Sequence, residues 1–438
     1  MFERPRGTRD FNPSQAASHR FVERAFRRIA EAFGFREVLT PTFENVELFK
    51  AKSGPGILEE MFTFKDKGGR DMALRPEFTA SIIRFYNSEL RSEPKPLKVF
   101  TLGNCFRYEE PQMGRYREFW QWNCEMIGAP SLESDSDVIA LADAGLKQVG
   151  LKKTELRIGH IGMLRKFLAF PPQDQATILH LLDKKRFADL KLALTQMGAG
   201  ELHDVVSSVA QLKGGPEVLD QAQSLLGQAA KESVEYLRML GGQLALYGIK
   251  DFAYDLGVVR GLDYYTGMVF EIDSPNLGAE KQVGGGGAYT LTDVLGGEAT
   301  SSTGFAIGVD RVVLSAGQEG VRMAPKPLDA YVIPIGQAMR ARAFEIVMHL
   351  RTAGLCADVD LMGRGPSKNL DYANSVKART SVLIGEKEAA KGVVALRDME
   401  SGKQTEISLQ DLVVALKGGS EPEAQKAAKK PKRRATKP

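Results

Sequence analysis

The chain has few cysteines and no long hydrophobic run. Its 438 residues include only Cys105, Cys124 and Cys356, too few and too scattered for a disulfide framework or a zinc site. No stretch is apolar over the length that a membrane span requires. The charged start, MFERPRGTRDF, lacks the apolar segment of a secretory signal. A phosphate loop of the Gly-Lys-Ser/Thr type is absent too. We therefore expect a cytoplasmic protein without membrane association.

The composition is that of an ordinary globular protein, with 43% hydrophobic and 26% charged residues. The length predicts two or three domains. The formal net charge is +4, but residues 418–438 alone contain seven Lys or Arg and two Glu. The rest of the chain is therefore nearly neutral. If it binds a nucleic acid, it must do so through local basic patches or through this tail.

The first part of the chain mixes helix and strand patterns. Apolar residues recur at helical spacing over residues 18–33, and a strand is expected at residues 37–43. Pro41 removes a ladder donor, which places that strand at an edge or interface. Further strand-like runs occur at residues 61–64, 98–108, 118–127, 155–161, 268–273 and 281–284.

The remaining sequence suggests a domain division. Residues 164–246 have helical patterns and predict an insertion in a larger mixed domain at 1–327. Strands alternate with helices over 328–417, which predicts a small α/β domain with a largely parallel sheet. Residues 418–438 lack apolar periodicity, and we expect a disordered basic tail there. The tail suits a solubilising end or a non-specific nucleic-acid-contacting arm equally, and a nuclear localisation signal would use the same residues.

Two segments combine charged and aromatic residues in positions that suggest chemistry. The segment LRPEFT at residues 74–79 by itself indicates only a turn, with Thr79 capping the next helix. Residues 106–125 predict a long β-hairpin with a charged tip. Alternation places Gln121, Asn123 and Glu125 on one strand face, opposite aromatics and a cysteine. That pattern favours a functional hairpin.

Two later segments are rich in glycine. RGLDYYTG at residues 260–267 sets an arginine, an aspartate and two tyrosines between glycines, which indicates a ligand pocket, although tyrosines often only fill cores. Residues 283–289, VGGGGAY, allow close backbone approach to a ligand, but are equally typical of a flexible connector. A helix starting near Asp310 would present Arg311 in its first turn.

In this order, these segments resemble class II aminoacyl-tRNA synthetases. The helix with Pro41 resembles motif 1, the 106–125 hairpin motif 2, and residues 304–311 motif 3. RGLDYYTG is similar to the signature of histidyl-tRNA synthetases, and the likeness extends over about residues 4–416. The resemblance implies an α+β fold: an antiparallel catalytic sheet flanked by helices, with a helical insertion and a C-terminal α/β anticodon-binding domain. It also implies a homodimer built on motif 1.

The resemblance assigns roles to individual residues. Glu77, Thr79 and Gln121 would hold the histidine α-amino group, and Glu125 and Tyr264, with Tyr265 beside it, would recognise the imidazole. Arg107 would contact the α-phosphate of ATP, Arg311 would lie near the γ-phosphate, and Glu109 would lie in the ATP site. Arg260 would lie between the substrate carboxylate and the α-phosphate, and it would be the second catalytic arginine besides Arg107. Gln112, Arg115 and Arg117 would meet the tRNA acceptor end. No metal site made of protein ligands alone is expected.

The implied activity is ATP-dependent activation of L-histidine and its transfer to tRNA(His), with Mg²⁺ accompanying ATP. Three positions depart from the family pattern: Ala288 and Thr290 replace an arginine and an acid, and Glu110 stands where many relatives have arginine. The alternatives are an inactive synthetase-like regulatory subunit of histidine biosynthesis and an RNA-binding accessory protein. Prolyl, threonyl and glycyl enzymes share motifs 1 to 3 and differ at RGLDYYTG. Tyr372 and Asn374 are the candidate anticodon contacts.

Overall fold

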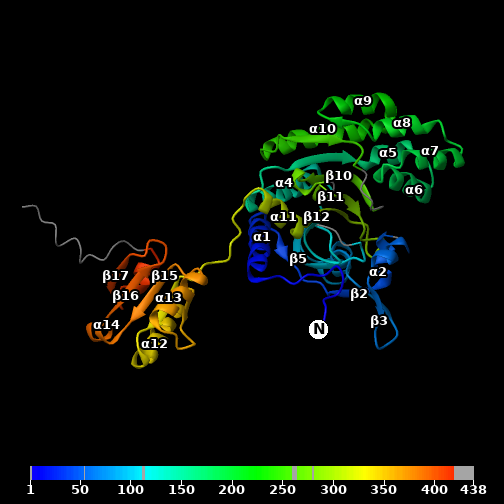
Figure 1. Cartoon of the computed structure of the whole chain (residues 1–438). Helices are drawn as coiled ribbons and strands as arrows, with labels where there is room; N and C mark the ends of the chain where they lie inside the picture. Colours follow the sequence, from blue (N-terminus) through cyan, green and yellow to red (C-terminus); the bar gives the residue numbers. More distant parts are fainter. Residues whose placement is uncertain (1, 54, 111–113, 259–263, 279–280, 419–438) are drawn as a thin grey trace, which may run out of the picture. The chain divides into compact units, whose positions relative to one another are not determined.

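The computed structural model describes residues 2–53, 55–110, 114–258, 264–278 and 281–418. It divides into two compact units, Met1–Ala324 and Pro325–Pro438, which are described separately below (Figure 1). The predicted site residues Gln112 and Arg260 and the predicted basic tail from residue 419 lie outside the described residues. No helix in the described part of the chain is both long and apolar enough to cross a membrane.

A mainly antiparallel sheet forms the centre of the first unit, as the resemblance implied. Within its described residues nine strands are ordered β1-β5-β6-β12-β11-β10-β7-β9-β8. Their bounds are β1 Arg36–Glu37, β5 Leu97–Phe106, β6 Glu118–Ile127, β7 Glu155–His160, β8 Lys213–Gly214, β9 Phe252–Asp255, β10 Tyr265–Asp273, β11 Gln282–Thr290 and β12 Ser301–Gly308. Only β1–β5 and β7–β9 pair in parallel among the strand pairs of this sheet that the structure describes.

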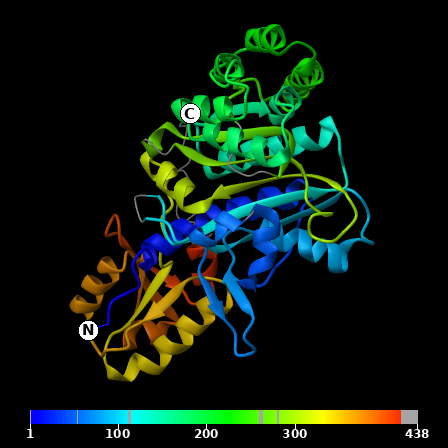
Figure 2. The same cartoon turned by 90° about the vertical axis from the view of Figure 1, so that its right-hand side faces the viewer.

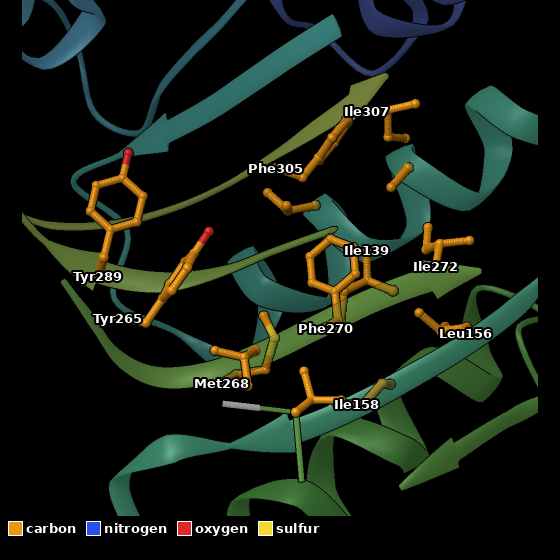
Figure 3. Packing of buried hydrophobic residues seen from close by; sticks show 14 of the residues in the cluster. Ile139, Leu156, Ile158, Tyr265, Met268, Phe270, Ile272, Tyr289, Phe305 and Ile307 are labelled. Atoms are coloured by element: carbon orange, nitrogen blue, oxygen red, sulfur yellow. The ribbon is translucent and has the colours of Figure 1, made fainter. Parts of the chain in front are cut away.

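Three long helices pack together with this sheet: α1 (Pro13–Ala32), α4 (Leu132–Val149) and α11 (Val309–Gln318). Trp122 on β6 is fully buried, stacks on Phe26 of α1 with ring centroids 4.3 Å apart, and meets Phe305 edge-on. Figure 3 shows the same apolar cluster around Phe270 and Phe305, with Tyr265 and Tyr289 at one side. Because side chains alternate along a strand, burying Trp122 against the helices turns Gln121 and Glu125 to the opposite face.

A helical segment is inserted between β7 and β9 and gathers as one group in Figures 1 and 2. It consists of α5 (Ile161–Phe167), α6 (Pro172–Asp183), α7 (Phe187–Gln196), α8 (Leu202–Val209), α9 (Glu217–Leu226), η3 (Gly227–Ala229) and α10 (Lys231–Leu246). Helix α10 lies against α4, where the Tyr236 hydroxyl donates to the Asp135 carboxylate at 2.5 Å. The insertion is therefore tied to the helices that cover the sheet.

The prediction of one strand over residues 37–43 is wrong. The chain leaves β1 after Glu37 and enters a separate three-stranded sheet, ordered β2-β4-β3. Its strands are β2 (Phe43–Asn45), β3 (Thr63–Lys65) and β4 (Asp71–Leu74). The buried Arg75 guanidinium donates to the carbonyls of Thr40 (2.9 Å) and Pro41 (3.2 Å) between the two strands. A side chain thus takes backbone acceptors that a continuous strand would give to a neighbour.

The short helices of the first unit surround that small sheet and the central hairpin. They are α2 (Val46–Ser53), η1 (Pro55–Glu60), α3 (Thr79–Phe85), η2 (Tyr86–Leu90) and, near α11, η4 (Pro275–Leu277).

The connector interpretation of the glycine run is also wrong. The run lies in β11, a buried strand between β10 and β12. A Cβ at Gly287 would lie 2.4 Å from the Met268 carbonyl oxygen and 3.0 Å from the Tyr265 ring. Glycine is therefore needed for close packing of the strand.

The second unit has a mixed sheet, so the expectation of a largely parallel one is corrected. The strand order is β14-β13-β15-β16-β17, with β13 parallel to β14 and β15, and β16 antiparallel to both of its neighbours. The short helix α14 (Glu386–Lys391) links β15 to β16, and a turn at residues 399–403 links β16 to β17; both connections return the chain antiparallel, whereas the parallel pairs need longer crossover helices. The elements are β13 (Ala330–Pro334), η5 (Gln337–Met339), α12 (Arg340–Thr352), β14 (Ala357–Val359), α13 (Pro366–Ser375), β15 (Thr380–Ile384), α14 (Glu386–Lys391), β16 (Val393–Asp398), β17 (Gln404–Ser408) and α15 (Leu412–Leu416).

Candidate active site

A cavity of about 380 Å³ opens over the polar face of β6. That volume is typical of small-molecule sites. Strands β6, β10, β11 and β12, helix α2 and the start of α11 contribute to its walls. The structure brings ten of the predicted site residues to this cavity: Glu77, Thr79, Arg107, Glu109, Arg115, Gln121, Glu125, Tyr264, Tyr265 and Arg311. Segments up to 234 positions apart in the chain thus meet in one pocket.

Glu125 is a buried acidic group that lines the pocket. Its carboxylate accepts hydrogen bonds from the Thr79 hydroxyl at 2.7 Å and the Tyr289 hydroxyl at 2.6 Å. Burial raises the pKa of the Glu125 carboxyl to about 7, although the two hydroxyls and the nearby Lys52 ammonium oppose the rise. Near neutral pH the group therefore exists in both protonation states and can accept or donate a hydrogen bond.

Room for the Glu125 carboxylate depends on Gly304 of the neighbouring strand β12. A Cβ at Gly304 would lie 1.8 Å from Glu125 Oε2. The two residues are paired across the β6–β12 ladder. No side chain larger than hydrogen fits there without moving the carboxylate, so Gly304 belongs to the site through the space that it leaves.

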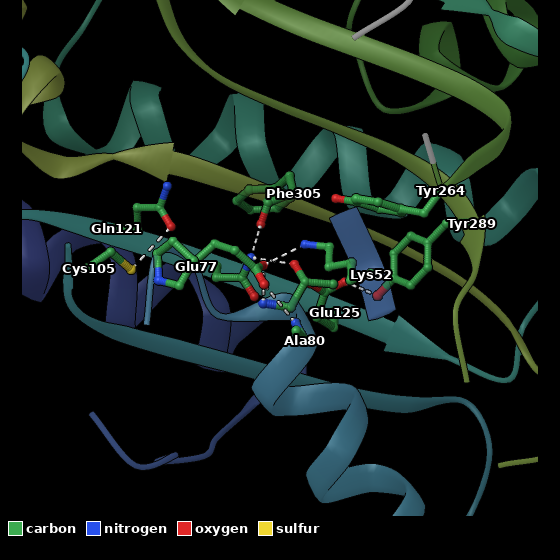
Figure 4. A network of polar contacts seen from close by, with 12 residues as sticks. Lys52, Glu77, Ala80, Cys105, Gln121, Glu125, Tyr264, Tyr289 and Phe305 are labelled. Carbon is green, nitrogen blue, oxygen red and sulfur yellow. Dashed lines mark hydrogen bonds and ion pairs between the residues drawn. The ribbon is translucent and has the colours of Figure 1, made fainter. Parts of the chain in front are cut away.

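Glu77 lies just before α3 and is held by three groups (Figure 4). Its carboxylate accepts from the backbone N–H groups of Thr79 (2.6 Å) and Ala80 (3.0 Å), and Lys52 Nζ lies 2.7 Å from Oε2. Burial raises the pKa of the Glu77 carboxyl, but Lys52 and the two N–H groups outweigh burial and leave that pKa below its ordinary value. Glu77, and not Thr79 as the sequence suggested, therefore caps this helix start.

Three tyrosines form an aromatic wall beside Glu125. The Tyr264 and Tyr265 rings lie 4.5 Å apart between centroids, and Tyr264 meets Tyr289 edge-on at 5.4 Å. The Tyr264 hydroxyl donates to the Tyr265 hydroxyl at 3.3 Å. Aromatic faces next to hydroxyl groups suit a flat, polar ring as a ligand.

Gln121 lies on the same strand face as Glu125, toward the hairpin. Its Oε1 accepts a weak hydrogen bond from Cys105 Sγ at 3.5 Å. Burial raises the pKa of the Cys105 thiol to about 12. The thiol is therefore protonated at physiological pH and cannot act as a nucleophile. Asn123 is buried, and its amide donates to the Phe305 carbonyl at 3.1 Å.

Arginines gather at the hairpin end of the pocket. Arg107 Nη1 lies 3.7 Å and Arg115 Nη1 3.6 Å from the Glu109 carboxylate, and Arg107 Nε donates to the Pro76 carbonyl. Arg311, in the first turn of α11, donates to the carbonyls of Gln282 and Gly114. Guanidinium groups that share one carboxylate can pair with an incoming phosphate.

A buried network supports the start of α11. The Asp310 carboxylate accepts from the Trp120 backbone N–H at 2.9 Å and from Arg9, and His19 Nε2 lies 3.5 Å away. Burial raises the pKa of the Asp310 carboxyl, but His19 and Arg9 outweigh burial and lower it. The N-terminal segment thereby fixes the strand that carries Gln121 to the helix that carries Arg311.

Two other predicted positions lie elsewhere on the hairpin. Arg117 does not line the cavity; its guanidinium lies over the Tyr108 ring, 3.9 Å from the centroid, and donates to the Glu109 carbonyl. The unusual Glu110 pairs with Arg6 at 2.8 Å, with both side chains exposed. Such a pair is worth about 0–1 kcal/mol.

The sequence interpretation did not identify Lys52 as a site residue or Tyr289 as a partner of Glu125. It also missed the network around Asp310. A signal for Lys52 was present: Val46, Phe49 and Lys52 recur every three residues on one face of α2. A lysine in that register must be buried, and buried lysines need a partner. The partner itself could not be identified locally.

Two family models match the chain: "Histidyl-tRNA synthetase" over residues 7–312 and "Anticodon binding domain" over residues 329–418. The histidine–tRNA ligase of Archaeoglobus fulgidus is 44% identical over 416 residues, covering 94% of this chain and 98% of the relative. That of Methanosarcina acetivorans is 42% identical over 417 residues, covering 95% and 98%. The apo histidyl-tRNA synthetase of S. aureus superimposes with a TM-score of 0.71 at 26% identity, covering 95% of this chain and 100% of that structure.

Proposed function

The chain belongs to the histidyl-tRNA synthetase family, and we propose how its pocket activates L-histidine with ATP and transfers it to tRNA(His). The regulatory-subunit alternative is not favoured, because relatives named histidine–tRNA ligase match over nearly the whole chain. The observation that carries the proposed mechanism is the buried Glu125 carboxylate, which lies in one cavity with an aromatic wall and with Arg107 and Arg311.

Histidine specificity follows from the polar groups around Glu125. Neutral imidazole has one N–H donor and one acceptor nitrogen. The Glu125 carboxylate accepts a hydrogen bond from the imidazole N–H. The hydroxyl of Tyr264, with Tyr265 beside it, donates a hydrogen bond to the other ring nitrogen. An amino acid without this pair of groups leaves buried polar atoms unpaired, which a site of this kind rejects strongly. Glu77, with Thr79 and Gln121, takes the α-ammonium group.

The chemical steps need no protein nucleophile. The histidine carboxylate oxygen attacks the α-phosphorus of ATP, and the bond to pyrophosphate breaks, giving histidyl-adenylate. A ribose hydroxyl at the tRNA end then attacks the carbonyl carbon, and AMP leaves with the bonding pair. Arg107 and Arg260 act at the α-phosphate and Arg311 near the γ-phosphate. Fixed positive charge and alignment lower the barrier to both steps.

Mg²⁺ accompanies ATP in this proposal. Among the described residues, no group of three or more His, Cys, Asp or Glu side chains is placed to hold a metal ion. The phosphate oxygens would therefore supply most ligands, with the Glu109 carboxylate at the pocket wall as a suitable oxygen donor. When bound, the ion neutralises charge on the leaving pyrophosphate.

The tRNA spans both units in our proposal. Gln112, Arg115 and Arg117 of the hairpin meet its acceptor end. Residues 328–417 act as the anticodon-binding domain, and residues 1–327 as the catalytic domain. The Arg364 guanidinium carbon lies over the Tyr372 ring, 4.3 Å from the ring centroid. Asn374, the other candidate, is exposed on α13.

We also propose a cytoplasmic homodimer. Leu39, Phe43 and Phe64, on and beside the small β2-β4-β3 sheet, have exposed fractions of 77%, 52% and 42%. Large apolar side chains gathered on one exposed sheet are typical of a subunit interface. The three cysteines are free, in keeping with a reducing compartment.

Pyrophosphate exchange into ATP, with each of the twenty amino acids supplied separately, tests the function. We expect exchange with histidine alone, and its loss in Glu125→Ala. Glu110→Gln, which changes an exposed glutamate on the hairpin, is the matched control and should keep exchange. Exchange with a different amino acid would overturn the pocket assignment. Absence of exchange with all twenty amino acids, with and without tRNA, would overturn the proposal that the protein is an aminoacyl-tRNA ligase.

A further inference from the structure

Lys52 is a buried cation that the mechanism above does not use. It lies on the inner face of α2 with Val46 and Phe49, and its side chain is only 1% exposed. Its Nζ atom lies 2.7 Å from Glu77 Oε2 and 4.5 Å from the centroid of the Tyr264 ring (Figure 4). Burying an ammonium group costs free energy. An apolar residue would therefore be expected at this position on the inner face of α2, unless the charge has a role.

The Lys52 charge acts on two of the carboxylates that line the pocket, Glu77 and Glu125. Backbone N–H groups satisfy hydrogen-bond acceptors of Glu77, but they do not neutralise its negative charge. Glu125 lies in the same cavity, and the charge of Glu77 disfavours its ionisation. Among the described residues that line the histidine end of the pocket, Lys52 is the cation that directly contacts one of these carboxylates.

We propose that Lys52 is a positioning residue of the histidine subsite, which holds the Glu77 carboxylate charged and oriented for the substrate ammonium group and supports the Tyr264 ring. This rests on the proposed function. Lys52 acts through Glu77 and Tyr264 and takes no part in bond making or breaking. In the free enzyme its ammonium lies against the carboxylate that receives the substrate ammonium, so the pocket is organised before histidine enters.

The groups that face this cluster come from several elements. They are Glu77 and Thr79 at the start of α3, Cys105 on β5, Glu125 on β6, Tyr264 and Tyr265 at the start of β10, Tyr289 on β11, and Arg107 at the hairpin. Burial raises the pKa of Cys105 to about 12 and that of Tyr289 well above its ordinary value. The two carboxylates are thus the groups that gain or lose a proton when the cation is removed.

Removing the cation should change the response to acid. Without Lys52, neither its charge nor its hydrogen bond lowers the pKa of the Glu77 carboxyl, and that pKa rises. The pKa of Glu125, which Lys52 also lowers, rises further. A protonated Glu77 cannot pair with the substrate ammonium, so histidine binding weakens progressively as the pH falls. A nearby opposite charge shifts a carboxyl pKa by about one unit or more. For Glu125, a rise of about one unit from a pKa of about 7 lowers the ionised fraction about tenfold at pH 6 and only slightly at pH 8.5, so the Glu125 carboxylate carries most of the expected effect in this pH range.

The test is the pH profile of kcat/KM for histidine in pyrophosphate exchange, from pH 6 to pH 9, with saturating ATP. Relative to wild type, Lys52→Met should lose about tenfold more activity at pH 6 than at pH 8.5. Its KM for ATP should change less than twofold. Lys52→Arg, which keeps the charge, should restore the wild-type profile. Lys50→Met is the matched control on the same helix, because Lys50 pairs with Glu47, whose side chain is 78% exposed.

The outcomes separate the two proposals. Wild-type exchange with histidine tests the function, whereas the ratio of variant to wild type across pH tests Lys52. A ratio that is low but constant with pH would overturn the proposal and leave Lys52 a packing residue. Thermal unfolding identifies misfolded variants. If Lys52→Met and Lys52→Gln both fail to fold while Lys52→Arg folds, the charge serves stability, and the proposal is overturned as well.

Discussion

Replacing Glu125 with glutamine should make the protein more stable in alkaline solution and less stable relative to wild type in acid. The folded-state pKa of Glu125 is about 7, above its ordinary value of 4.5. Between these values the folded protein keeps a proton that the unfolded chain loses, so wild-type stability falls as the pH rises from about 4.5 to 7. The pKa difference corresponds to about 3 kcal/mol. Glutamine carries no charge, and the hydroxyls of Thr79 and Tyr289 can rotate to satisfy its amide.

Thermal unfolding of the two proteins at pH 5 and pH 8 measures the effect. For a unit of the size of Met1–Ala324, 3 kcal/mol corresponds to about 4 °C in Tm. We expect the Tm of Glu125→Gln minus that of wild type to increase by about this amount between the two pH values. A difference that stays constant with pH would refute the reasoning, because Glu125 would then ionise in the folded state as easily as in water.

Two further predictions concern the supports of the site. Gly304→Ala should lower kcat/KM for histidine at least about tenfold and cost about 1–3 kcal/mol of stability, because its Cβ collides with the Glu125 carboxylate. The control Gly242→Ala, in open space on α10, should instead stabilise the protein by about 0.5–1 kcal/mol. Chemical denaturation measures the stability of both variants, and pyrophosphate exchange measures their activity. Burial lowers the pKa of His19, but Asp310 and Glu23 outweigh burial and raise it. Its stabilising contribution is therefore complete below about pH 6.5 and lost as the pH rises, so the Tm difference between wild type and His19→Gln should shrink from pH 6 to pH 9. An unchanged difference would mean that the imidazole is neutral throughout.

Local patterns in the sequence were sufficient where one strand or helix faces one environment. The strand expected at residues 118–127 has those bounds as β6, because apolar and polar residues alternate from Trp120 to Met126. The helix expected at residues 18–33 begins earlier, at Pro13, where Asn12 and Gln15 form a capping box. That signal is local, and the sequence contained it. The fold class and the family also follow from sequence, because the motifs are short and contiguous.

Only the tertiary structure decided which residues meet. Lys52 and Glu77 lie 25 positions apart, and Glu125 and Gly304 meet across β6 and β12, which the chain connects through the whole helical insertion. The glycine run is a strand because β10 and β12 enclose it. The chain leaves β1 after Glu37, and Arg75 takes the carbonyl groups of Thr40 and Pro41 in the link to β2. Side-chain periodicity is set by bonds along the chain, whereas charge pairing, pKa and free space depend on atoms that only folding brings within a few ångströms. The sequence therefore determined the family and the candidate residues, and the fold determined how their charges and contacts are arranged.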